Sequence, residues 1–91
     1  MAAIIVSGAN EKATEKIAYE LKKYAPNGEG ISVLGPAPAP IYMLRGKFRY
    51  RLLLKTLRNI NIQLILKKWL GMLNIPANVR VEVDVDPYSF M

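Results

Sequence analysis

Strict alternation between apolar and charged residues, in two segments, constrains the fold of this chain most. Residues 47–55 carry cations at odd positions, interrupted only by Leu53, and at even positions Phe48, Tyr50, Leu52 and Leu54. Residues 79–86 carry valine at odd positions and at even positions Arg80, Glu82, Asp84 and Asp86. A period of two is typical of strands that bury one face and expose the other. We therefore expect a sheet with one covered face and one open face.

Two other segments repeat their apolar residues at helical spacing. Asn10 offers a side-chain oxygen that can cap a helix, and a single apolar stripe follows it, made of Ala13, Ile17, Leu21 and Tyr24. Residues 62–73 form a second helical segment whose broader apolar arc contains Ile62, Ile65, Leu66, Trp69, Leu70, Met72 and Leu73. Ile60 and Leu64 fall on the outer side of this segment, where they indicate a partner surface.

The remaining apolar runs complete the predicted fold. Ala2–Gly8 and Ile31–Leu34 are short runs that predict strands. Residues 35–40 have proline at every second position, and we expect a stiff connector there because proline donates no backbone hydrogen bond to a sheet. The order βαββαβ favours an α+β, ferredoxin-like fold, with a four-stranded antiparallel sheet and both helices on one face. Residues 1–91 are expected to form a single domain around one core.

The composition excludes several kinds of active site. The chain has no cysteine and no histidine, which excludes zinc fingers, disulfide frameworks, thiol nucleophiles and histidine acid–base chemistry. Ser7–Asn10 separates a strand from a helix but lacks the residues of a phosphate-binding loop. Glu82, Asp84 and Asp86 could approach a hard cation, although a solvated strand face is the favoured interpretation. We expect no metal, no cofactor and no catalysis by this chain.

Hydropathy gives no indication of a membrane segment. No apolar run reaches the roughly 18 residues that a spanning helix needs, and the first residues lack the basic start of a signal peptide. A helix lying on a membrane surface is also disfavoured, because Lys67 and Lys68 flank an apolar arc that the core requires. A cytoplasmic protein without membrane contact is the expectation.

Positive charge is concentrated in the middle of the chain. The formal net charge is +6, and residues 30–81 contain nine cations and no acidic residue. If the even positions of residues 47–55 face the core, the open face receives a basic row, which comprises Lys47, Arg49, Arg51 and Lys55, with Arg45 in the preceding turn. Its members stand roughly 7 Å apart along the strand, which is comparable to the phosphate spacing of an extended nucleic-acid strand. The row predicts contact with a polyanion.

Plainer interpretations of the same residues remain open. The cations could form a solvated surface, or they could protect an edge strand from pairing with another chain. Tyr42 lies between the prolines and the basic strand, and it could stack on a base or simply pack against the domain.

Three sequence blocks resemble one protein family. Val33–Ile41 contains Gly-Pro-Ala-Pro-Ala-Pro, Leu44–Lys55 contains Arg-Gly-Lys-Phe-Arg-Tyr, and Val83–Pro87 reads Val-Asp-Val-Asp-Pro. In this order and spacing the blocks resemble the carboxyl-terminal domain of primosomal protein N′, the PriA family of bacterial replication-restart helicases. The resemblance covers nearly the whole chain.

The resemblance implies that this domain is similar in fold to ribosomal protein S ten. It also implies that the domain contacts DNA and the other domains of an ATP-driven helicase. It implies that ATP, magnesium and zinc belong to other parts of that protein, so that this segment needs no cofactor of its own. The family has basic or aromatic residues at the positions of Arg45, Lys47, Phe48, Arg49 and Tyr50, and their roles are transferred to these residues. Met43 departs from the pattern, because a polar or basic residue is expected there.

The resulting hypothesis is a DNA-binding and domain-docking module for primosome assembly at stalled forks, with single-stranded or forked DNA as its ligand. The predicted DNA-binding residues are Arg45, Lys47, Arg49, Tyr50, Arg51 and Lys55. The alternative is an interaction scaffold that docks the motor, other primosome proteins or the acidic tail of the single-stranded-DNA-binding protein. In the family this tail docks near the junction of the domain with the motor, and Arg58, just before the second helical segment, is the position to test for it.

Overall fold

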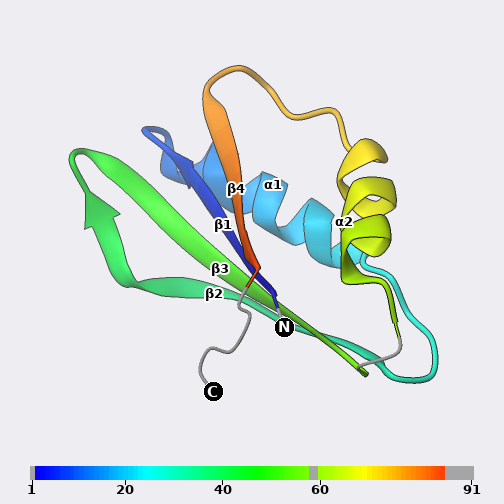
Figure 1. Cartoon of the computed structure of the whole chain (residues 1–91). Coiled ribbons are helices and arrows are strands. Elements are labelled where there is room, and N and C mark those ends of the chain that lie inside the picture. Colours follow the sequence, from blue (N-terminus) through cyan, green and yellow to red (C-terminus); the bar gives the residue numbers. More distant parts are fainter. Residues whose placement is uncertain (1, 58–59, 86–91) are drawn as a thin grey trace.

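The computed structural model describes residues 2–57 and 60–85, apart from the side chains of residues 40 and 41. Arg58 and Asp86 therefore lie outside the described residues. The elements are, in chain order, β1 (Ala2–Gly8), α1 (Glu11–Lys23), β2 (Ile31–Leu44), β3 (Lys47–Thr56), α2 (Ile62–Gly71) and β4 (Val79–Val85) (Figure 1). The predicted order of strands and helices is confirmed.

The strands form one antiparallel sheet in the order β2-β3-β1-β4. The predicted α+β class and antiparallel pairing are thus confirmed, whereas the count of four strands is not exact. The pairing of β2 with β3 shifts register between Leu34 and Ala37 and again between Pro38 and Met43. With this irregular pairing the antiparallel sheet can also be counted as five strands.

The proline segment belongs to the sheet, and the prediction of a separate connector was wrong. Ala37 pairs with Arg51 and Pro38 with Tyr50, so residues 35–40 continue β2. This is possible because β2 is an edge strand, whose outer side needs no backbone donors. The pairing with β3 shifts register on either side of Pro38, so the regular hydrogen-bond pattern is interrupted where proline has no backbone N–H to donate.

The core lies between one face of the sheet and the helices. Ile4 pairs with Leu52 and Val6 with Tyr50, and all four side chains are buried. Helix α1 passes behind β1 and β4 in Figure 1 and places Ile17 and other apolar residues on this face. The buried core cluster contains Ala2, Ile4, Val6, Ile17, Ala18, Leu21, Tyr50, Leu52, Leu54, Leu66, Trp69 and Val79.

Helix α2 packs beside the carboxyl-terminal end of α1 (Figure 1). The Trp69 indole N–H donates to the Leu21 carbonyl over 3.0 Å, and both residues are buried. Met72 was wrongly assigned to the apolar arc, because α2 ends at Gly71 and leaves 63% of Met72 exposed. Leu64 is exposed, as its outer position predicts. Neither of the two described helices is long and apolar enough to cross a membrane.

The predicted cap of α1 is confirmed and gives a first test. Asn10 Oδ1 accepts from the Ala13 N–H over 2.9 Å, while the Asn10 carbonyl accepts from the Thr14 hydroxyl over 2.7 Å. We expect Asn10→Ala to lower the free energy of unfolding by about 1 kcal/mol, because it leaves one helix donor without its side-chain acceptor. Urea denaturation measures the change. Asn10→Asp is the matched control and should keep the wild-type midpoint; an equal loss in both variants would contradict the capping role.

Candidate nucleic-acid interface

The basic row lies on the sheet face that the helices leave uncovered. In β3 the even residues from Tyr50 to Leu54 are buried, whereas Lys47 and Lys55 are exposed and Arg49 and Arg51 are half-buried. This alternation confirms that the cations point away from the core. We call the uncovered side, with the cations of β3 and the charged residues of β4, the open face.

Strand order brings a cation from a distant part of the chain to this face. Ser7 of β1 pairs with Arg49 of β3 on one side and with Arg80 of β4 on the other. The three side chains therefore form one row across three strands, because directly paired residues of an antiparallel sheet project to the same side. Sequence reasoning missed Arg80 as a site residue, since only the position of β4 beside β1 places it here.

The open face is hollowed at this end. The hollow has a volume of about 270 Å³ and is lined by Ser7, Leu44, Arg45, Lys47, Arg49, Arg80 and Glu82. Four of these side chains are cationic and one is acidic, so the hollow carries an excess of positive charge. Such a concave, cationic surface concentrates field lines and attracts anions.

The hairpin turn between β2 and β3 supplies Arg45. Arg45 has φ 53° and Gly46 has φ 77°, so both central residues of the turn adopt positive φ. Turns of this kind match the twist of the two strands, but they favour Asn, Asp or Gly at both positions. A long side chain in the left-handed region is uncommon and marks a position for functional scrutiny. Here it places an arginine at the rim of the hollow.

Acidic side chains share the open face with the cations. Glu82 follows Arg51 and Ile5 in one row of paired residues, and Asp84 follows Leu53 and Ala3 in the next. The cations therefore occupy β3 and the hairpin end, whereas β4 carries carboxylates from Glu82 onward. Counting charge along the chain could not reveal this, because residues far apart in sequence become neighbours only in the sheet.

Tyr50 does not belong to the open face, which corrects its assignment as a DNA-binding residue. It is 6% exposed and faces the helices, since residues of a strand alternate between the two sides. Its hydroxyl lies 3.0 Å from that of Tyr42, and the two rings meet edge to face with centroids 5.5 Å apart.

Tyr42 is held in the same aromatic group and packs against the domain. Its hydroxyl donates to the Glu11 carboxylate, and its ring also meets that of Phe48 edge to face. The hydrogen bond to Glu11, together with that to Tyr50, raises the pKa of Tyr42 well above its usual range. The plainer interpretation, packing, thus describes Tyr42 better than stacking on a base.

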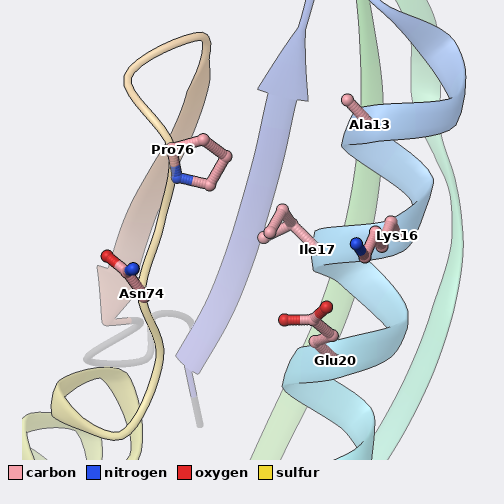
Figure 2. A pocket seen from close by; sticks show the side chains of 6 residues that line it. All are labelled: Ala13, Lys16, Ile17, Glu20, Asn74 and Pro76. Atoms are coloured by element: carbon pink, nitrogen blue, oxygen red, sulfur yellow. The ribbon is translucent and has the colours of Figure 1, made fainter.

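A second hollow, of about 300 Å³, lies on the other side of the sheet, between α1 and the segment before β4. Figure 2 shows Ile17 and Pro76 pointing toward the space between helix and loop. Lys16 and Glu20 carry opposite charges at its edge, so this hollow has no excess of positive charge. Arg58, the residue assigned to a partner, lies outside the described residues.

Comparison with known proteins gives the family. The family model described as "Primosomal protein N C-terminal domain" matches residues 1–88. The chain belongs to this family. The resemblance found in the sequence is thereby confirmed, and the chain is a PriA C-terminal domain, from a family of replication-restart proteins.

Curated relatives support this membership. The replication restart protein PriA of Rickettsia felis is 38% identical over 89 residues, which cover 98% of this chain and 14% of the relative. Its counterpart in Synechocystis is 34% identical over 86 residues, covering 90% of this chain and 10% of the relative. The Bacillus subtilis protein is 31% identical over 80 residues, covering 85% and 10%. The PriA C-terminal domain thus spans about a seventh, or less, of these relatives' lengths.

Proposed function

We propose that this PriA C-terminal domain binds the DNA backbone through the cations of its open face and has no catalytic activity of its own. The observation that carries the proposal is the gathering of Arg45, Lys47, Arg49 and Arg80 around one hollow, continued along β3 by Arg51 and Lys55. We also propose that the domain is ferredoxin-like, which the element order βαββαβ and the antiparallel sheet support. We propose that the protein acts in the cytoplasm. The proposed DNA binding needs no cofactor held by this chain.

The chemistry of the open face favours recognition of phosphates over recognition of bases. Arginine and lysine donate to phosphate oxygens without reading sequence. The aromatic residues Tyr42 and Tyr50, which could stack on bases, lie on the helix side. The names of the relatives place them in replication restart, and single-stranded or forked DNA is the ligand that we propose for this domain.

Binding should therefore be sensitive to salt. We expect the 91-residue chain to bind a fluorescently labelled oligo-dT and a labelled forked duplex. Four or five phosphate contacts predict a log–log slope of affinity against salt of about −3 on the single strand. Fluorescence anisotropy across a salt series measures this slope. Absence of binding at low salt would contradict the proposal.

A second candidate function is the docking of another protein surface. An apolar strip on the open face favours this function. Leu34 pairs with Leu53, which pairs with Ala3, so these three apolar residues lie in one row on this face. Leu34 is 46% exposed. The proposed partners are the rest of the helicase, other primosome proteins and the acidic tail of the single-stranded-DNA-binding protein, with Arg58 as the residue to reverse. This function would be favoured if the chain did not bind DNA but bound an acidic peptide, as measured by calorimetry.

A further inference from the structure

The hollow at the hairpin end combines residues from both halves of the chain. Arg49 and Arg80 stand on either side of Ser7, and adjacent strands are about 4.8 Å apart. Their Cα atoms are therefore separated by about 10 Å, a distance that two arginine side chains can close around one small anion. Arg45 and Lys47 line the same hollow from the hairpin.

The arrangement suits a phosphate group. Guanidinium groups present paired N–H donors that match two phosphate oxygens, and lysine adds a point charge. Ser7 is 8% exposed at the floor, where its hydroxyl can donate to a further oxygen. A row along one strand could only follow a backbone, whereas a hollow lined from β1, β3, β4 and the hairpin surrounds one group.

We propose that this hollow seats a single backbone phosphate of the bound nucleic acid, that Arg80 is one of its ligands, and that Glu82 competes with the phosphate for Arg80. The inference rests on the proposed DNA binding and adds to it a specific seat with an intramolecular competitor. An internal phosphodiester is the proposed group, and a terminal phosphate offers the same oxygens.

The position of Glu82 supports its role as competitor. Its Oε2 lies 3.9 Å from Arg80 Nε, and the two side chains are 58% and 71% exposed. An ion pair this long and this exposed is weak, so an arriving phosphate can replace the carboxylate without disturbing the fold. Asp84 lies one row further along the same face and does not line the hollow. It therefore serves as a matched control for the loss of one negative charge.

The test measures the affinity of the 91-residue chain for labelled oligo-dT in 0.1 M salt. Arg80→Gln removes one phosphate contact, and we expect about fivefold weaker binding with a salt slope smaller by about 0.7. Glu82→Gln should bind about threefold more tightly. In Asp84→Asn the change in affinity should be smaller, less than about 1.5-fold. In Arg80→Gln/Glu82→Gln, the gain from Glu82→Gln should largely disappear, because no arginine remains to be released.

The outcomes separate this inference from the proposed function. One outcome is that the wild-type chain binds DNA and Lys47→Gln weakens binding, while Arg80→Gln and Glu82→Gln leave affinity and salt slope unchanged. That outcome would overturn the proposed phosphate seat and leave DNA binding by the basic row supported. Equal gains in Glu82→Gln and Asp84→Asn would also overturn the competitor. Oligonucleotides with and without a 5′-phosphate distinguish the two sources: equal affinity supports the internal phosphodiester, and an Arg80-dependent preference for the phosphorylated oligonucleotide would overturn that choice.

Discussion

Replacing Trp69 by alanine should lower the free energy of unfolding by about 3–5 kcal/mol, the largest stability change expected for any single substitution considered. Trp69 is 2% exposed and joins α2 to the core cluster. Its removal leaves a cavity, because the elements around it are held by their own hydrogen bonds and collapse only in part. It also leaves the Leu21 carbonyl without the indole donor that now binds it over 3.0 Å.

Urea denaturation followed by circular dichroism measures this loss, and unchanged urea dependence of the unfolding free energy would show that the same surface unfolds. Met72→Ala is the control, because this neighbouring residue is 63% exposed and its truncation should change stability by less than about 0.5 kcal/mol. Trp69→Phe should fall between the two, since it keeps much of the ring but not the N–H donor. A loss below about 1 kcal/mol in Trp69→Ala would mean that α2 contributes little to the core.

Local sequence patterns correctly predicted the elements that face the core with the same side along most of their length. Ala2–Gly8 is a strand over the predicted range, and Asn10 caps α1 as expected. The alternation in residues 47–55 also assigned the faces of β3 correctly, because one side of this strand meets the core along most of its length. In these segments the period of the apolar residues and the position of the core agree.

The errors arise where the environment of a residue depends on distant parts of the chain. Residues 35–40 are part of β2 only because β2 lies at the edge of the sheet, and proline content alone cannot report strand order. Met72 fits the apolar arc by its periodicity, but α2 ends before it. Both outcomes reflect tertiary context that overrides a local signal.

The candidate site divides in the same way. The cations of β3 could be placed from their own alternation, whereas Arg80 and Glu82 reach the hollow through the pairing of β4 with β1. Tyr50 shows the opposite error, because similarity to a family transferred a role to a side chain that the strand's own alternation directs into the core. A sequence-based assignment gains accuracy when the face of the strand is checked before the role is transferred.

Reversing two cations of the basic row should nearly abolish DNA binding without unfolding the domain. In Lys47→Glu/Arg51→Glu two phosphate contacts are lost and two repulsive charges replace them, so we expect affinity for oligo-dT in 0.1 M salt to fall by about a hundredfold or more. Lys47 is exposed and Arg51 half-buried on the open face, and neither side chain belongs to the core cluster. The fold should therefore survive, which a thermal melt checks.

The decisive comparison is with Lys67→Glu/Lys68→Glu, which makes the same charge change on exposed residues of α2. Each double variant lowers the formal net charge from +6 to +2, so total charge cannot distinguish them. If binding depended on net charge alone, the two variants would lose affinity equally. If the open face carries the contacts, the α2 variant should keep its affinity within about threefold, because exposed charges more than about 10 Å from the bound strand are screened at this salt concentration. The ratio of the two affinities thus measures how much of the DNA binding depends on where the cations lie.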